Sequence, residues 1–320
     1  MKKINIIPSK RLLDKTESVI CVTYNSNGTH IIASQNDNTI LIYDANTGDE
    51  QLKLSGPHYT VVAVAISPDG RTVASAIQYG PIILWDMETG KEIRAISVGH
   101  VNSMMFSPDG KYLVVATGED DVDDIFKLNY DYPVCCCDLT NGQVKKLIGH
   151  TYLVTSATFS SDGLRIVSTS GDNTAIIWDV QTCQQIHRFE RGFVFSALEY
   201  NKKYRRHGLD YDCFKSVYSA RFNIDRTLLV TASRDSLQLW DVEAKSELWK
   251  KTMRTRDAIF SPDGKYLLVA TNEIRLLDVE TGNELCKIDK FVKEIAFSPN
   301  GNHILSLSYE GDVDVWDLCL

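Results

Sequence analysis

Short apolar runs, rich in β-branched and aromatic residues and separated by turn residues, follow one another along the chain. One group of runs covers residues 61–67, 72–76, 82–85 and 92–97, with a Pro-Asp-Gly turn between the first two and a Thr-Gly turn between the last two. Each run has the length and composition of a β-strand, and Pro and Gly supply the backbone angles that tight turns require. Because no useful length of sequence has the 3.6-residue period of a helix, the pattern predicts an all-β fold.

Two markers recur along the chain and divide it into seven units. The first is a turn, which reads Ser-Pro-Asp-Gly at 67–70, 107–110 and 261–264 and has degenerate copies at 25–28, 160–163, 223–226 and 298–301. The second is an aspartate that ends a short apolar run; it follows tryptophan in four units and Tyr, Cys or Leu in the other three. These aspartates are Asp44, Asp86, Asp138, Asp179, Asp241, Asp278 and Asp317.

Spacing shows where two of the units are longer than the others. From turn to aspartate the distance is 14 to 16 residues in six units and 28 in the third. From aspartate to the next turn it is 23 to 26 residues in five cases and 47 between Asp179 and Arg226. The third unit therefore carries an insertion after its turn, and the fifth carries one before its turn.

This pattern resembles that of the WD-repeat β-propeller family, in which a period of about 40 residues forms one four-stranded blade. The Trp-Asp pairs are accompanied by a Gly-His element at Gly99-His100 and Gly149-His150, with a remnant at His58. The resemblance covers essentially the whole chain. It implies a single domain, a seven-bladed β-propeller whose four-stranded antiparallel blades lie at about 14–56, 57–98, 99–148, 149–190, 191–251, 252–288 and 289–320, the last completed by residues 1–13.

The resemblance also assigns structural roles to individual residues. His150 and Asp172 are expected to pair, and Ser168 and Trp178 to complete a structural network around them. The chain ends directly after the third strand of the seventh blade, so the segment 4–13 is expected to supply the missing outer strand. That pairing would remove an open sheet edge, which otherwise invites aggregation.

Composition and charge narrow the functional classes. The net charge of −8 argues against general nucleic-acid binding, which requires an excess of Lys and Arg to neutralise phosphates. The cysteines at 135–137 lack the spacing of a zinc site, so we expect buried side chains and predict no metal site or cofactor. The longest purely apolar stretch, residues 61–66, is too short to span a bilayer. Free thiols and an N-terminus without an export signal indicate an intracellular protein, in the cytoplasm or the nucleus.

Both insertions are expected on one face of the propeller, which carries the loops between second and third strands and those between blades. The first insertion is acidic and the second is basic, while the matching loop of the next blade adds two arginines. Charge combined with aromatic anchors is typical of protein-recognition surfaces. Candidate partner-binding residues are Tyr59, Tyr79, Asp120, Asp121, Asp123, Asp124, Tyr152, Lys202, Lys203, Tyr204, Arg205, Arg206, Arg254, Arg256 and Tyr309.

The sequence therefore favours a non-catalytic scaffold or adaptor that binds proteins or peptides, within a multi-subunit complex, rather than small molecules. Phosphopeptide or phosphoinositide recognition by the basic loop at 202–206 is an alternative, because Arg side chains match phosphate oxygens. Solvated decoration is another reading of the charged loops. Calcium binding by the acidic loop lacks the spacing of a known calcium-loop motif. An enzyme is disfavoured because no nucleophile elbow, metalloprotease helix, phosphate loop or dinucleotide fingerprint occurs.

Overall fold

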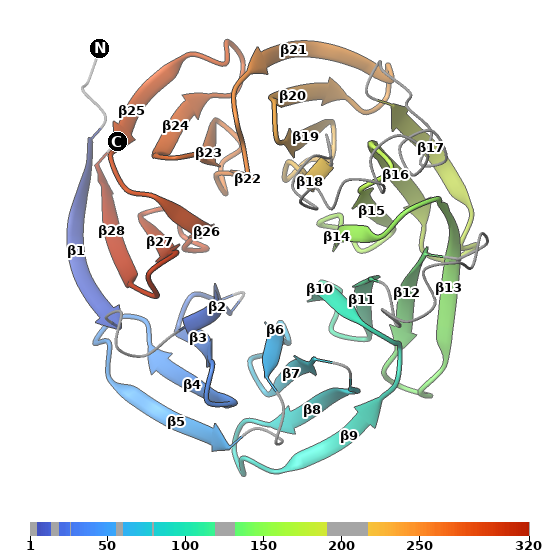
Figure 1. The fold of residues 1–320 in the computed structure, drawn as a ribbon, viewed down its shortest axis with the longest axis vertical. Helices are drawn as coiled ribbons and strands as arrows, with labels where there is room; N and C mark the ends of the chain where they lie inside the picture. Colours follow the sequence, from blue (N-terminus) through green and yellow to red (C-terminus); the bar gives the residue numbers. More distant parts are fainter. Residues whose placement is uncertain are drawn as a thin grey trace, which may run out of the picture.

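Seven four-stranded sheets form a closed ring in the computed structural model, which describes residues 5–13, 19–25, 27–55, 60–78, 80–118, 132–190 and 217–319 (Figure 1). The blades are numbered in chain order, and in each the first strand lies nearest the centre of the ring. The predicted seven-bladed, all-β propeller is confirmed.

The first four blades consist of consecutive strands. They are β2 (Val19–Tyr24), β3 (His30–Gln35), β4 (Thr39–Asp44) and β5 (Glu50–Ser55); β6 (Val61–Ile66), β7 (Thr72–Ile77), β8 (Ile82–Asp86) and β9 (Glu92–Ile96); β10 (Val101–Phe106), β11 (Tyr112–Thr117), β12 (Tyr132–Asp138) and β13 (Val144–His150); and β14 (Val154–Phe159), β15 (Arg165–Ser170), β16 (Thr174–Asp179) and β17 (Gln185–Glu190).

The last three blades follow the same order, with one exception at the chain ends. They are β18 (Val217–Phe222), β19 (Leu228–Ser233), β20 (Ser236–Asp241) and β21 (Ser246–Thr252); β22 (Asp257–Phe260), β23 (Tyr266–Ala270), β24 (Ile274–Asp278) and β25 (Glu284–Ile288); and β26 (Val292–Phe297), β27 (His303–Ser308), β28 (Val313–Cys319) and β1 (Asn5–Leu13). The strands predicted at 61–67, 72–76, 82–85 and 92–97 differ from the observed ones by one residue at their ends. Strand β13 extends to His150, two residues past the boundary that we expected for the third blade.

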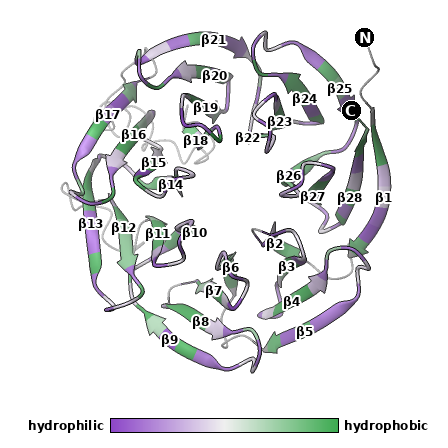
Figure 2. Cartoon of the chain, turned by 180° about the vertical axis from the view of Figure 1, so that it is seen from behind, coloured by the Kyte–Doolittle hydropathy of each residue, from purple (hydrophilic) through white to green (hydrophobic). Residues whose placement is uncertain are grey.

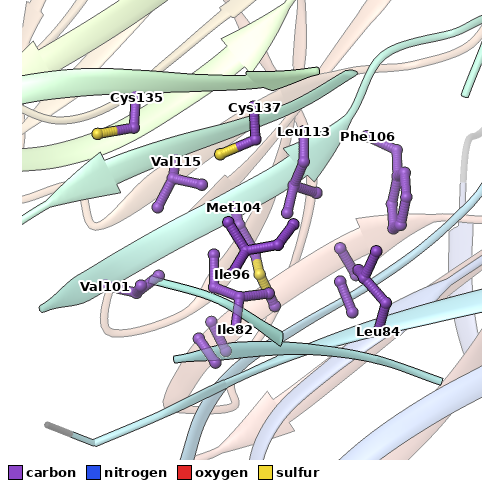
Figure 3. Close-up of a cluster of buried hydrophobic side chains, with 14 residues drawn as sticks. Ile82, Leu84, Ile96, Val101, Met104, Phe106, Leu113, Val115, Cys135 and Cys137 are labelled. Atoms are coloured by element: carbon purple, nitrogen blue, oxygen red, sulfur yellow. The ribbon is translucent and has the colours of Figure 1, made fainter. Parts of the chain in front are cut away.

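Hydrophobic contacts between neighbouring blades form the core. Figure 3 shows one such cluster, in which Ile82 and Leu84 of the second blade face Leu113 and Val115 of the third. Second and third strands are almost wholly buried, whereas outer strands alternate between hydrophilic and hydrophobic positions (Figure 2). Burying a large aliphatic side chain contributes about 2 kcal/mol, so each interface between blades is strongly stabilising.

The three consecutive cysteines belong to this core. Cys135 and Cys137 pack against the second blade and Cys136 against the fourth, as expected from the alternation of side chains along a strand. Burial raises the pKa of the Cys136 and Cys137 thiols to about 12, so both remain protonated. They act as small hydrophobic side chains.

Turns between first and second strands contact the equivalent turns of neighbouring blades on one face of the ring. Gly28 of the first blade has φ +73°, and a Cβ there would lie 2.9 Å from Cδ of Pro299 in the seventh blade. The equivalent position in the fifth blade is Arg226, which has φ 65° and forms an ion pair of 3.0 Å with Asp162 of the fourth blade. An ion pair therefore supplies at this seam the contact between turns that glycine and proline make elsewhere.

The ring closes through the N-terminal strand, as predicted. Strand β1 pairs antiparallel with β28, from Asn5 opposite Cys319 to Leu13 opposite Val313. Arg11 contacts Asp314 at 2.9 Å, and Lys10 donates to the carbonyl oxygens of Ala45 at 3.0 Å and Asn46 at 2.9 Å in the first blade. The strand thus completes the seventh blade and holds it against the first.

We expect deletion of residues 1–13 to destabilise the entire ring. The deletion removes the ladder to β28 and the contacts of Lys10 and Arg11, and it exposes β28 as an edge. A midpoint lowered by about 10 °C or more should be seen in thermal unfolding monitored by circular dichroism. A truncated protein with the same midpoint of thermal unfolding as the full-length chain would show that β1 is dispensable for closure.

Candidate functional site

A buried chain of hydrogen bonds links the third blade to the fourth. His150, at the end of β13, contacts Asp172 through Nδ1 at 3.0 Å and Ser168 through Nε2 at 2.8 Å. Trp178 Nε1 donates to the same Ser168 hydroxyl at 2.8 Å. The structure therefore brings together the four residues of the expected network.

The network contains serine, histidine and aspartate, but its burial prevents catalysis by this set. Ser168 is 0% exposed, so no substrate can reach its Oγ. Burial alone would raise the pKa of Asp172, but hydrogen bonds from His150 and Thr174, the His150 charge and the Thr151 N–H outweigh burial and lower this pKa to about 2. The arrangement stabilises a seam between blades.

The other Trp-Asp units contain a related hydrogen bond that we did not foresee. Indole N–H groups donate to a hydroxyl of the second strand in each case: Trp85 to Ser75 at 2.8 Å, Trp240 to Thr231 at 2.9 Å and Trp316 to Ser306 at 2.8 Å. The signal in the sequence is a Ser or Thr nine or ten residues before each tryptophan.

The repeated aspartates are structural as well. Asp86 accepts hydrogen bonds from the Thr89 hydroxyl and backbone N–H, both at 2.7 Å, and these bonds lower the pKa of Asp86. Asp179 accepts the same pair of hydrogen bonds from Thr182. Asp86 and Asp179 therefore cap the turns between the third and fourth strands of their blades.

Most of the predicted partner-binding residues lie outside the described part of the chain. These are Tyr59, Tyr79, the acidic residues Asp120, Asp121, Asp123 and Asp124, and the basic loop residues Lys202, Lys203, Tyr204, Arg205 and Arg206. Four candidates are described: Tyr152, Arg254, Arg256 and Tyr309. They lie in connections between blades or between second and third strands. Antiparallel order places these connections on one face, here called the loop face, which includes residues 151–153, 253–256, 289–291 and 309–312.

Tyr152 is partly buried rather than freely presented. Its ring lies 5.7 Å from that of Tyr132, and its carbonyl oxygen accepts a hydrogen bond of 2.8 Å from Ser170. These contacts anchor the connection between the third and fourth blades.

Arg256 and Tyr309 come together with Phe291, a residue that sequence reasoning missed. The rings of Phe291 and Tyr309 stack with centroids 4.6 Å apart, and Arg256 Cζ lies 4.9 Å from the first ring and 4.6 Å from the second. Arg256 also donates to the Tyr309 hydroxyl. Phe291 is 44% exposed and Tyr309 48% exposed, so this aromatic–arginine cluster presents apolar surface on the loop face. An aromatic residue in the connection before the seventh blade was the available signal.

A cleft with a volume of about 710 Å³ lies between the fifth and sixth blades, which are neighbours in Figure 1. Residues that line it include Lys251, Arg254, Thr271, Glu273, Arg275 and Asp289. Arg275 contacts Glu273 at 2.7 Å and Glu284 at 2.8 Å, and Lys287 contacts Glu273 at 2.8 Å. Arg254 was predicted as a binding residue, whereas the cleft beside it was not foreseen.

A carboxyl group lies in the seam between the seventh and first blades. Glu294 Oε2 accepts a hydrogen bond of 3.0 Å from the backbone N–H of Val22. Although part of the residue is accessible to solvent, desolvation of the carboxyl raises the pKa of Glu294 to about 7, against the opposing effects of Lys293 and this hydrogen bond. The protonation state of this seam therefore changes near neutral pH.

Within the described ranges, no group of three or more His, Cys, Asp or Glu side chains is placed to hold a metal ion. The acidic loop considered for calcium falls outside those ranges. In the same described residues, no helix is long and apolar enough to cross a membrane.

Comparisons with protein families agree with the repeat pattern. The WD domain, G-beta repeat model matches residues 141–179 and 283–317. Residues 2–130 are similar to the family model described as eukaryotic translation initiation factor eIF2A.

Individual relatives share part of their length with this chain. WD repeat-containing protein SL1-17 of Schistosoma mansoni is 30% identical over 165 residues, 51% of each protein. Small ribosomal subunit protein RACK1y of Oryza sativa subsp. japonica is 30% identical over 165 residues, 51% of this chain and 48% of the relative. The beta-1 subunit of guanine nucleotide-binding protein G(I)/G(S)/G(T) of Homarus americanus is 31% identical over 141 residues, 42% of this chain and 38% of the relative. The matched region is thus about half, or less, of each relative.

The fold itself matches that of a solved propeller along its whole length. The β-propeller domain of Myceliophthora thermophila Cps50 (Swd1) superimposes with a TM-score of 0.76, covering 98% of this chain and 100% of the other at 15% identity. The protein is therefore a seven-bladed β-propeller. Two of its repeats match the WD domain, G-beta repeat model, and about half of the chain is similar to a WD repeat-containing protein, so the repeats are of the WD type.

The buried network makes a prediction about stability. Asp172→Ala leaves the His150 ring, the Thr174 hydroxyl and the Thr151 N–H without their acceptor. We expect a loss of about 3 kcal/mol in the free energy of unfolding, measured by urea denaturation. As a control, Asp317→Ala breaks the His303–Asp317 pair, whose side chains are 42% and 41% exposed, and should lower the free energy of unfolding by less than about 1 kcal/mol. Equal losses would contradict the structural role of the network.

The seam carboxyl predicts a pH dependence. Because the folded protein holds the Glu294 proton more tightly than the unfolded chain does, this group stabilises the fold most below its ordinary pKa of 4.5. That contribution is lost as the pH rises through about 7. Glu294→Gln keeps an acceptor for Val22 but cannot ionise, so it should be close to native stability at pH about 4.5 and more stable than native at pH about 8. Urea denaturation at both values measures this; a difference that stays constant with pH would refute it.

Proposed function

We propose that this protein is a non-catalytic scaffold or adaptor that binds partner proteins or peptides through its loop face. The observation that carries the proposal is the aromatic–arginine cluster of Arg256, Phe291 and Tyr309. Tyrosine and arginine are enriched among residues that dominate binding energy at protein interfaces. Two stacked rings that are nearly half exposed provide apolar area at a small conformational cost, because the stacking and the arginine already restrict them.

The rigidity of the ring supports the same proposal. Blades bury their faces against one another, and the cluster is formed by three short connections: from β21 to β22, from β25 to β26 and from β27 to β28. A surface on such a support loses little entropy when a partner binds. Two of the similar proteins are named as a ribosomal-subunit protein and a guanine nucleotide-binding protein subunit, which are names of complex members. We propose that this chain also acts within an intracellular complex, in the cytoplasm or the nucleus.

Affinity purification with mass spectrometry tests the proposal. A double variant, Phe291→Ala with Tyr309→Ala, should recover its main partners about tenfold less well than the native chain, because both apolar anchors are removed. The matched control is Ile93→Ala with Ile186→Ala, which removes side chains 54% and 43% exposed on the outer strands β9 and β17. Both variants should melt as the native protein does.

Unchanged recovery by the folded double variant would rule out the cluster as the contact surface. A second variant with Lys202, Lys203, Arg205 and Arg206 changed to Glu examines the basic loop separately. Loss of partners in this variant alone would move the contact to that loop, and loss in neither would contradict binding through the loop face.

A further inference from the structure

The cleft between the fifth and sixth blades and the aromatic–arginine cluster share two chain segments. In the connection from β21 to β22, Arg254 lines the cleft and Arg256 belongs to the cluster. In the connection from β25 to β26, Asp289 lines the cleft and Phe291 belongs to the cluster. Two residues span at most about 7 Å, so the cleft and the cluster adjoin and form one surface.

Some cationic side chains at the cleft form ion pairs with carboxylates, whereas others form none with the residues that the structure describes. Arg275 is held by Glu273 and Glu284, and Lys287 by Glu273, so these charges are largely neutralised. Lys251 and Arg254 make no ion pair within the part of the chain that the structure describes, and Arg254 is exposed. The cleft therefore offers two cationic groups to a ligand.

We infer that this composite surface binds an acidic linear segment of a partner protein. Its carboxylates contact Arg254 and Lys251 in the cleft, and an aromatic or aliphatic residue two or three positions away packs on Phe291 and Tyr309. This inference rests on the proposed function and assigns the chemistry of its partner. The whole protein has a net charge of −8, so its surface as a whole attracts basic peptides. The cations of the cleft act in the opposite direction and favour acidic peptides at this place.

The remaining charges of the cleft favour carboxylates over a phosphate group. Glu273 and Asp289 are part of its lining and reduce the positive potential there. A phosphate concentrates nearly two negative charges at one point, whereas carboxylates along a peptide carry one each and can place themselves beside separate cations. An open cleft of about 710 Å³ accommodates several residues of such a peptide.

Synthetic peptides test this directly on the full-length protein. The probe is a dye-labelled Glu-Glu-Glu-Gly-Phe peptide, compared with Lys-Lys-Lys-Gly-Phe, Glu-Glu-Glu-Gly-Ser and a version whose first residue is phosphoserine. Fluorescence anisotropy measures each dissociation constant at low and at physiological salt. The acidic aromatic peptide should bind most tightly, and its binding should weaken with salt because exposed charges are screened.

Matched charge reversals locate the binding. Arg254→Glu should weaken binding of the acidic aromatic peptide about tenfold, since it replaces attraction by repulsion. Lys91→Glu makes the same change in net charge at an exposed turn of the second blade and should alter binding less than about twofold. Phe291→Ala should weaken the Phe peptide but leave the Ser peptide unchanged.

Three outcomes would overturn the inference: no preference for the acidic over the basic peptide, equal weakening by Arg254→Glu and Lys91→Glu, or tighter binding of the phosphoserine peptide. The co-purification experiment is independent of these measurements. If partners still depend on Phe291 and Tyr309 while acidic peptides fail to bind, this inference is wrong and the proposed function stands.

Discussion

Packing of each blade against both of its neighbours is the constraint on which the rest of the structure depends. A four-stranded sheet has two apolar faces here, and each face is covered only by the next blade in the ring. Every blade therefore needs two neighbours, and the condition can be met for all seven only if the ring closes. Strand β1 meets it by crossing from the start of the chain to β28 at its end. The stability of any one blade is thus coupled to the joining of the chain ends.

Polar contacts at the seams add direction to this packing. His150 reaches from β13 into the fourth blade, Arg226 pairs with Asp162 across the next seam, and Trp249 donates to the Val279 carbonyl at 2.9 Å between the fifth and sixth blades. Hydrophobic contact alone would allow neighbouring sheets to slide, whereas buried hydrogen bonds require one register. Loops that emerge from such a ring keep fixed ends while their sequences vary, which suits the fold to recognition.

The repeat made the fold predictable because each unit carries its own local signals. Turn residues and the terminal aspartate follow backbone requirements within a few residues, so they can be found without knowledge of distant contacts. The four-residue network around His150 could be named in advance through the family resemblance. The pairing of Trp85 with Ser75, and the ion pair that replaces a glycine–proline contact at Arg226, depend on register and on neighbouring blades. The first requires the register of two neighbouring strands to be known, and the second joins residues of different blades.

The candidate site could be predicted from local sequence signals even less well than the fold. Arg254, Arg256 and Tyr309 were selected because they are charged or aromatic residues in loops, but Phe291 was not considered. Its role follows from the pairing of β26 with β27, in which Val292 lies opposite Ser308, so residues 291 and 309 meet just beyond the ends of the two strands. The sequence pointed to the large charged insertions, yet the aromatic–arginine cluster that the structure describes is made of short connections. Short connections between packed blades hold their side chains in place, so in this ring they form an organised surface of aromatic and charged side chains without any insertion.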